Sequence, residues 1–291
     1  MSNHFPTAAT ALLPGAALLL GGCLGATDPA LSGGQRVPGT ELAICPNDTG
    51  FFLSPDGRWL VFEIGDTSDP GYVAFASPRF AVLDVVKAEV REVVVAEDVL
   101  ALAGEQEGPL AARACWDADG RRLVMPGPGR GSWFAIDAGS PAPGLAAAQS
   151  PACAAEGEGD DPAAGVIRIE RRSPRRVEIT SRAGGEVLAA HEAEGAGSTR
   201  IDVGRLRLSP DGRYASYVVT ERQGSFASPS RAFVLDLAAP RPDRPRLLAA
   251  PVLGSPLWSP QSVLYACTGG RGDSTPRIVR WSPEAFDRQP S

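Results

Sequence analysis

Short apolar runs interrupted by turn residues make up most of this chain. Residues 51–62, FFLSPDGRWLVF, show the pattern: two β-prone runs flank the tetrapeptide Ser54, Pro55, Asp56, Gly57. Proline presets φ at the second position of a turn, aspartate hydrogen-bonds the local backbone, and glycine adopts the positive φ that other residues avoid. The pattern predicts two antiparallel strands joined by a tight turn.

The same unit recurs along the chain. SPDGRYASYVVT at 209–220 aligns without gaps to SPDGRWLVFEIG at 54–65. A third copy is DADGRRLVMPG at 117–127, and two degraded copies are WSPQSVLYACTG at 258–269 and SPRRVEITSRAGG at 173–185. The predicted turn residues outside the first copy are Asp119, Gly120, Ser209, Pro210, Asp211 and Gly212.

The second half of the unit repeats as well. FASPRFAVLD at 75–84 matches FASPSRAFVLD at 226–236, and SWFAIDAG at 132–139 is a shorter version. Each of these three strands ends in an aspartate: Asp84, Asp137 or Asp236. A further short strand is predicted at 88–96 and at 244–252. The large ring after the turn, Trp59 or Tyr214, is expected to pack against a neighbouring sheet.

The repeat length indicates the architecture. The five units start at 54, 117, 173, 209 and 259, a mean spacing of about 51 residues, which suits a four-stranded propeller blade. Residues 96–108 predict at most a short turn of helix, and strands do not alternate with helices as a parallel α/β fold requires. The sequence therefore predicts an all-β propeller of about five blades, within a range of four to seven, each a four-stranded antiparallel sheet.

SPDGRWLVF followed by FAVLD resembles the WD-like repeat of TolB-type β-propellers, over most of residues 45–283. The resemblance implies a single propeller domain at 41–291 that contacts other proteins. The sialidase Asp-box does not fit, because it needs one more residue between aspartate and the aromatic ring. We expect the N-terminal strand ELAIC at 41–45 to close the ring beside RIVRW at 277–281.

The N-terminus predicts export. Residues 8–22 are apolar and uncharged, too short to span a bilayer, and typical of a secretory signal peptide at 1–22, although no Lys or Arg precedes them. Leu20-Gly21-Gly22-Cys23 resembles the bacterial lipobox, which implies lipidation of Cys23 and, with Leu24 after it, an outer-membrane address facing the periplasm or the cell surface. Residues 23–40 are rich in turn-forming residues and predict a flexible tether.

Four cysteines remain: Cys45, Cys115, Cys153 and Cys267. Export permits disulfides, and four cysteines allow three pairings. If the ring closes as expected, Cys45 pairs with Cys267 across the closure and Cys115 with Cys153 between successive blades. The spacings do not suit a zinc site, which needs close pairs.

Catalytic motifs are absent from the sequence. Beyond the signal peptide there is one histidine, His191, which is predicted to lie on the surface, and no G-x-S-x-G elbow accompanies it. GPGRGSWF at 127–134 leads into a strand and predicts a turn, not a phosphate loop. No cofactor and no metal are expected.

The net charge of −6 argues against nucleic-acid binding. We therefore expect a non-catalytic, lipid-anchored module that binds another envelope protein through loops at 65–79, 101–113, 148–164 and 221–230. Two alternatives stay open: a carbohydrate-active enzyme that uses carboxylates alone, or a calcium or small-ligand sensor built on the acidic residues Glu156, Glu158, Asp160 and Asp161.

Overall fold

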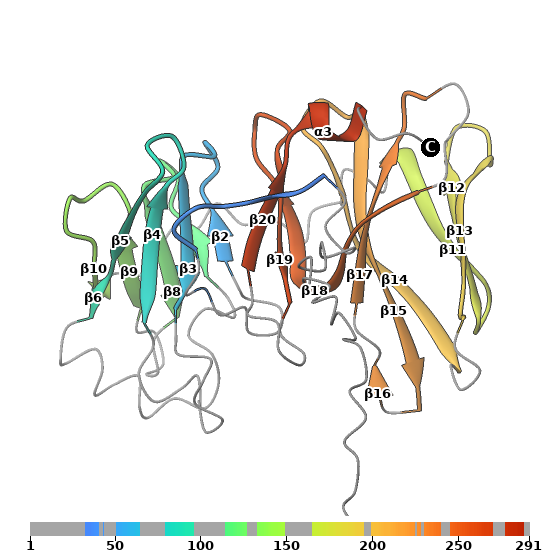
Figure 1. The fold of residues 1–291 in the computed structure, drawn as a ribbon, viewed down its shortest axis with the longest axis horizontal. Helices are drawn as coiled ribbons and strands as arrows, with labels where there is room; N and C mark the ends of the chain where they lie inside the picture. Colours follow the sequence, from blue (N-terminus) through green and yellow to red (C-terminus); the bar gives the residue numbers. More distant parts are fainter. Residues whose placement is uncertain are drawn as a thin grey trace, which may run out of the picture.

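The computed structural model describes residues 33–40, 43, 51–64, 79–95, 114–126, 133–148, 165–194, 199–224, 226–227, 230–239, 245–269 and 277–287. Nearly all of them belong to antiparallel sheets that stand side by side (Figure 1). The described residues form five blades, numbered here in chain order. The all-β propeller predicted from the repeats is confirmed.

The first two blades are separate sheets. Blade 1 consists of β2 (Phe51–Leu53), β3 (Trp59–Glu63), β4 (Phe80–Asp84) and β5 (Glu89–Glu92). Blade 2 consists of β7 (Cys115–Trp116), β8 (Arg122–Pro126), β9 (Trp133–Asp137) and β10 (Gly144–Ala148). The two-residue strand β6 (Val94–Val95), which follows blade 1, pairs in parallel with β10 and so ties the two blades together.

Blades 4 and 5 are joined through one long strand. Blade 4 contains β14 (Arg200–Leu208), β15 (Tyr214–Gln223), β17 (Ser230–Asp236) and the first half of β18 (Arg246–Trp258). The two-residue strand β16 (Phe226–Ala227) pairs antiparallel with the end of β15. The second half of β18 pairs with β19 (Leu264–Thr268), which pairs with β20 (Arg277–Trp281). A register shift between Leu253 and Leu257, with Gly254 at φ 74°, lets β18 serve both blades.

The N-terminal strand completes blade 5. β1 (Gln35–Arg36) lies antiparallel to β20, with Gln35 opposite Arg280. The expectation that an N-terminal strand lies beside 277–281 is therefore met by Gln35–Arg36, whereas Ala43, the one described residue of the predicted strand 41–45, pairs with blade 1. The chain turns after β1, with Gly39 at φ 82°, and Ala43 then bridges to Ile64 of blade 1. β1 also lies within the 23–40 segment, so the part of that segment around β1 belongs to the folded domain.

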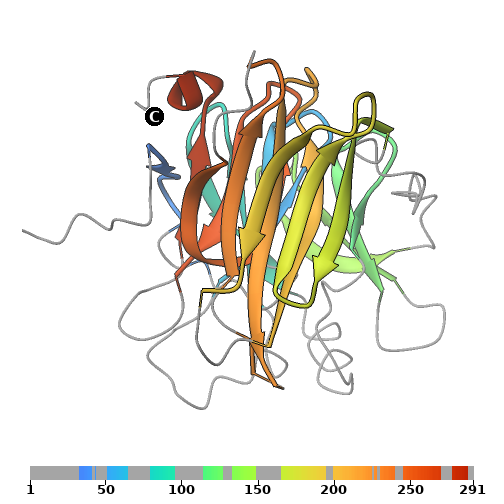
Figure 2. The same cartoon turned by 90° about the vertical axis from the view of Figure 1, so that its right-hand side faces the viewer.

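Blade 3 has three described strands: β11 (Ile167–Ser173), β12 (Arg176–Ser181) and β13 (Val187–Glu192). Figure 2 looks onto this blade in yellow-green, with the orange strands of blade 4 beside it. The alignment of the degraded copy at 173–185 with the other copies is wrong. Pro174 accepts a hydrogen bond from Ile201 N–H at the start of β14, whereas the Ser209 turn follows the end of β14. Ser173-Pro174 is thus a tight hairpin turn at the opposite end of the blades.

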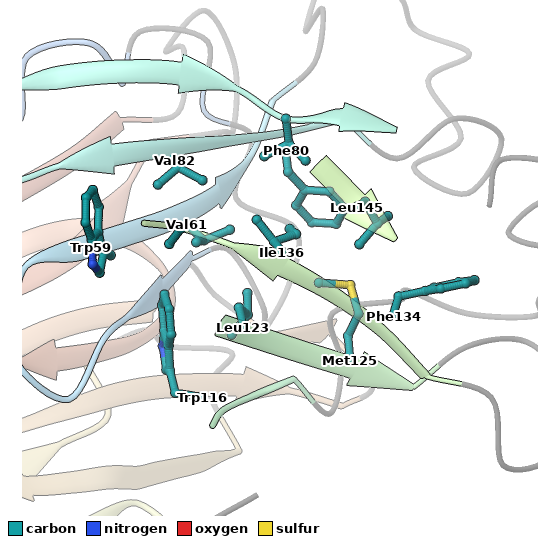
Figure 3. Close-up of a cluster of buried hydrophobic side chains, with 12 residues drawn as sticks. Trp59, Val61, Phe80, Val82, Trp116, Leu123, Met125, Phe134, Ile136 and Leu145 are labelled. Carbon is teal, nitrogen blue, oxygen red and sulfur yellow. The ribbon is translucent and has the colours of Figure 1, made fainter. Parts of the chain in front are cut away.

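Within the described part of the chain, four hydrophobic cores join neighbouring blades. One lies between blades 1 and 2 (Figure 3), and others join blades 3 and 4, blades 4 and 5, and blades 5 and 1. Trp59 faces blade 2 and Tyr214 faces blade 5, so each ring after the turn packs on the next blade, as predicted. Among the described residues, no such core joins blades 2 and 3. The short helix α3 (Pro283–Asp287) follows β20 and packs Phe286 against Tyr214 and Trp258.

Candidate functional site

The Ser-Pro-Asp-Gly sequence of blade 1 closes on itself through hydrogen bonds. Ser54 N–H donates to the Trp59 carbonyl at 2.8 Å, and Trp59 N–H donates to Ser54 Oγ at 2.9 Å. Asp56 Oδ1 accepts the Ser54 hydroxyl and the Arg58 N–H. Gly57 N–H donates to the Ser54 carbonyl, and Gly57 has φ 73°. Ser54, Asp56 and Gly57 therefore each have a local structural role in the turn.

Blade 4 repeats this geometry almost contact for contact. Tyr214 N–H donates to Ser209 Oγ at 2.9 Å, Asp211 Oδ1 accepts from Ser209 and Arg213, and Gly212 has φ 70°. In blade 2 an aspartate takes the place of the serine: Asp117 Oδ1 accepts Arg122 N–H at 2.9 Å, and Gly120 has φ 67°. The turn thus needs an oxygen acceptor at its first position, and serine or aspartate supplies it.

The degraded copy in blade 5 keeps a shorter version of the turn. Ser259 N–H donates to the Val263 carbonyl, so this turn contains one residue fewer than the turn at Ser54. Ser262 stands where the other copies have glycine, and it adopts φ 57°. The turn at 259 survives the loss of Asp-Gly at the cost of a strained non-glycine residue.

The turns of neighbouring blades touch one another. A Cβ on Gly120 would lie 3.3 Å from Pro55 of blade 1, and a Cβ on Gly57 would lie 2.9 Å from Pro260 of blade 5. Gln261 Nε2 donates to the Asp56 carbonyl at 3.4 Å. The four turns therefore form a continuous arc at one end of blades 2, 1, 5 and 4, which we call the turn arc.

The arc ends at Asp211 of blade 4. Hydrogen bonds lower the pKa of this carboxyl, above all the bond from the Ser209 hydroxyl and also those from the Arg213 N–H and the Ser262 side chain. The bond from Ser262 crosses from blade 5 to blade 4. The carboxylates of Asp56, Asp117 and Asp211 therefore accept hydrogen bonds that hold the turns of the arc together.

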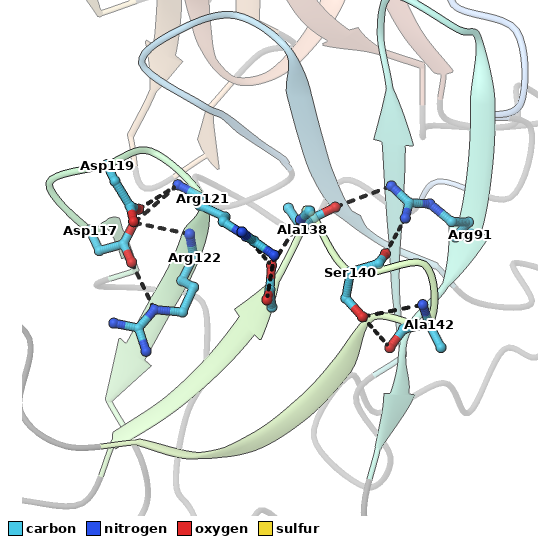
Figure 4. A network of polar contacts seen from close by, with 10 residues as sticks. Arg91, Asp117, Asp119, Arg121, Arg122, Ala138, Ser140 and Ala142 are labelled. Carbon is cyan, nitrogen blue, oxygen red and sulfur yellow. Dashed lines mark hydrogen bonds and ion pairs between the residues drawn. The ribbon is translucent and has the colours of Figure 1, made fainter.

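An arginine follows each complete turn and reaches the aspartate that ends the third strand. Arg58 pairs with Asp84 at 3.6 Å, and Arg121 and Arg213 pair with Asp137 and Asp236, both at 3.1 Å. In each blade the aspartate also accepts a backbone N–H of the following turn, for example Val86 N–H on Asp84. Figure 4 shows the version in blade 2. This arginine–aspartate contact explains why the third strands end in aspartate.

His191 does not lie on the surface as predicted, since it is half-buried between blades 3 and 4. Its Nε2 lies 2.9 Å from the Tyr217 hydroxyl, and its ring lies 4.8 Å from that of Phe233. Burial first, and the positive charge of Arg231 second, lower the pKa of His191 to about 4. The imidazole is therefore neutral at pH 7, and it satisfies a buried tyrosine hydroxyl whose own pKa is raised by burial.

Charged groups surround this histidine. Arg231 donates to Glu221 Oε1 at 2.8 Å and lies 3.6 Å from Glu194. Glu221 falls inside the segment 221–230 that the sequence assigns to a loop, but it is buried in β15. Tyr217 is fully buried, and the cluster of His191, Tyr217, Arg231 and Glu221 joins blades 3 and 4.

Two charged features were not found from the sequence. Asp202 accepts from three arginines, Arg171, Arg200 and Arg222, and these bonds lower the pKa of its carboxyl although burial opposes them. Glu63 is 5% exposed at the end of β3. Strand alternation carries a signal for Glu63, because a residue two positions from Val61 shares its inward face.

The remaining predicted residues are placed only in part. Cys267 is fully buried in β19 and Cys115 is half-buried in β7, while their predicted partners Cys45 and Cys153 lie outside the described residues. The pairing stays a prediction. Cys23, the acidic residues at 156–161 and most of the four predicted binding loops also lie outside the described residues.

Two negative findings concern only the described residues. They contain no group of three His, Cys, Asp or Glu side chains arranged to hold a metal ion. No helix in this part of the chain is long and apolar enough to cross a bilayer.

No protein-family model and no curated protein matches the chain. Three solved structures illustrate what it is similar to. The Cps50 (Swd1) β-propeller domain of Myceliophteria thermophila matches at 12% identity and a TM-score of 0.31, over 82% of this chain and 98% of that one. U3-55K matches at 9% identity and a TM-score of 0.34, over 86% of this chain and 99% of that one.

An oligogalacturonate lyase in complex with manganese matches at 11% identity and a TM-score of 0.33, over 86% of this chain and 93% of that one. These values are too low for any residue role to be transferred. The order of the blades rests on the sheets and cores of this chain.

Proposed function

We propose that this protein is a lipid-anchored, non-catalytic β-propeller of a bacterial cell envelope, which binds another envelope protein. The proposed binding surface is the end of the blades opposite the turn arc. The supporting observation is that the connections between strands are mostly short at the turn-arc end and that the longest ones leave from the opposite end.

At the turn-arc end most connections are short, and their described turns are internally bonded. They include the Ser-Pro-Asp-Gly turns and the turns after the third strands, whose N–H groups are bound by Asp84, Asp137 and Asp236. β3 runs away from this end, so residues 65–78 connect β3 to β4 at the opposite end. The connections from blade 1 to blade 2 and from blade 2 to blade 3 also leave strands that run away from the arc.

Long connections gathered at one end of a rigid scaffold are the usual carriers of binding residues. The predicted binding segments 65–79, 101–113 and 148–164 are of this kind, and the first contains Tyr72 and Phe75. Tyrosine and phenylalanine are enriched in protein interfaces. The anchor proposal rests on the lipobox-like Leu20-Gly21-Gly22-Cys23.

The test is photo-crosslinking of the tethered protein in intact cells. Tyr72→Ala is expected to remove a cross-linked partner that the wild type captures reproducibly. Arg121→Ala, on the turn-arc end, is the matched control and is expected to keep it. Loss of the partner in the Arg121 variant alone would contradict the proposed surface. Incorporation of a palmitate analogue that persists in Cys23→Ser would contradict the proposed anchor.

A further inference from the structure

Glu63 occupies an apolar position between blades 1 and 2. It ends β3, on the same face as Trp59 and Val61, and it lies opposite Phe80 of β4. Trp59, Val61 and Phe80 are all members of the core between the two blades. With only 5% of its surface exposed, the Glu63 carboxyl is held within this interface.

The described surroundings offer this carboxyl no compensation. Glu63 Oε2 is buried without a hydrogen-bond partner. The side chains that blade 2 contributes to this core from β8, β9 and β10 are apolar: Leu123, Met125, Phe134, Ile136 and Leu145. Burial therefore raises the pKa of Glu63 to about 7, and no opposing charge reduces the effect.

Charged groups on the same face of blade 1 lie toward the turn arc and are already engaged or exposed. Arg91 lies opposite Val82, and its guanidinium donates to the carbonyls of Ser140 and Ala138 in blade 2. Asp84 lies opposite Trp59 and accepts two turn N–H groups, and Glu89 is exposed beside it. Glu63, at the other end of β3, is the carboxyl on this face that these groups leave unpaired.

We propose that Glu63 is a proton-binding site that makes the packing of blade 1 on blade 2 dependent on pH. The protonated, neutral carboxyl stays buried beside Phe80. The ionised carboxylate needs water or a cation, so ionisation weakens this interface and the end of β3 that leads into residues 65–78.

The direction of the pH dependence follows from where Glu63 binds its proton more tightly. The folded protein binds this proton more tightly than the unfolded chain, whose glutamate titrates near 4.5. Stability contributed by the neutral carboxyl is therefore complete below pH 4.5 and is lost as pH rises toward 7. Between pH 5 and pH 8 the unfolding equilibrium constant is expected to rise roughly 70-fold through this group alone.

The experiment compares urea unfolding of the wild type, Glu63→Gln and Glu92→Gln from pH 5 to pH 8. Glu92 is an exposed glutamate of the same blade, paired with Arg79 at 2.6 Å. Glu63→Gln is expected to lose the roughly 70-fold change, and Glu92→Gln to retain it. Parallel pH profiles for the wild type and Glu63→Gln would overturn the proposal.

A second measurement covers a variant that fails to fold. In the wild type, the Glu63 carboxyl resonance of ¹³C-labelled protein is expected to titrate near pH 7. Amide exchange at Ile64, whose N–H donates to the Arg79 carbonyl, should accelerate over the same range beyond the intrinsic effect of pH. A carboxyl that titrates near its ordinary value would contradict the proposal.

Discussion

At the scale of single residues, the Ser-Pro-Asp-Gly turns show what a short motif specifies. The need for positive φ at Gly57, Gly120 and Gly212 follows from local turn chemistry, so it is readable from the sequence. The contact between Gly57 and Pro260 cannot be read from the sequence, because those residues meet only when blade 5 packs beside blade 1. The motif therefore predicts backbone conformation but not the contacts of the turn arc.

Substitutions at two glycines separate the cost of positive φ from the cost of a clash between neighbouring turns. Gly57→Ala is expected to destabilise the protein by about 2–4 kcal/mol, because the new Cβ adds a clash with Pro260 and Gln261 to the cost of positive φ. Gly212→Ala has a similar φ and nothing within 4 Å of its Cβ, so about 1 kcal/mol is expected. Urea unfolding measures both. Equal losses would mean that the turns do not touch.

At the scale of strands and blades, the repeated half-units predict strand positions well. β4, β9 and β17 all end at the predicted aspartates, and β19 and β20 fall within predicted strands. The error at Ser173-Pro174 shows the limit: a Ser-Pro pair fits a turn at either end of a blade, and only the partner of Pro174 decides which. The prediction that His191 lies on the surface failed for a similar reason, because blade 4 covers the imidazole.

Substitutions of Asp84 and Asp137 test the arginine–aspartate contact that links the turn to the third strand. Asp84 is 1% exposed and accepts two turn N–H groups, so Asp84→Ala is expected to destabilise by about 2–3 kcal/mol. The Asp137 side chain is 40% exposed, and its ion pair with Arg121 is solvated, so Asp137→Ala should lose less than about 1 kcal/mol. Chemical unfolding checks both. A larger loss for Asp137→Ala would sink this interpretation.

His191 tests the packing of blade 3 on blade 4. Its pKa is about 4 in the folded protein and near 6.5 when unfolded, so stability is complete above pH 6.5 and is lost as pH falls toward 4. After discounting for partial exposure, this loss is about 1–2 kcal/mol at pH 4.5. His191→Gln is expected to lack it. The check is urea unfolding from pH 4.5 to 7.5, where identical slopes in the two proteins would rule out a buried neutral imidazole.

At the scale of the whole molecule, the first and the last described strands, β1 and β20, pair within the same blade. The sequence predicts that an N-terminal strand closes the ring beside β20, but it names 41–45 because ELAIC is the more apolar segment. β1 is instead a polar, exposed pair, Gln35–Arg36, and its position is fixed by Val37 packing into the core between blades 5 and 1. Two exposed residues at an outer edge carry no hydrophobic pattern to detect.

The central claim is that the N-terminal strand β1 completes blade 5, and an engineered disulfide tests it most directly. Gln35 and Arg280 are opposite one another, so Gln35→Cys with Arg280→Cys places two thiols at a spacing that a disulfide can bridge. Gln35→Cys with Arg277→Cys is the control, since Arg277 lies about 10 Å further along β20. Non-reducing peptide mapping of the monomer should find an intrachain 35–280 link and no 35–277 link. A folded protein that forms no 35–280 link, or links 35 to 277 as readily, would contradict the completion of blade 5 by β1.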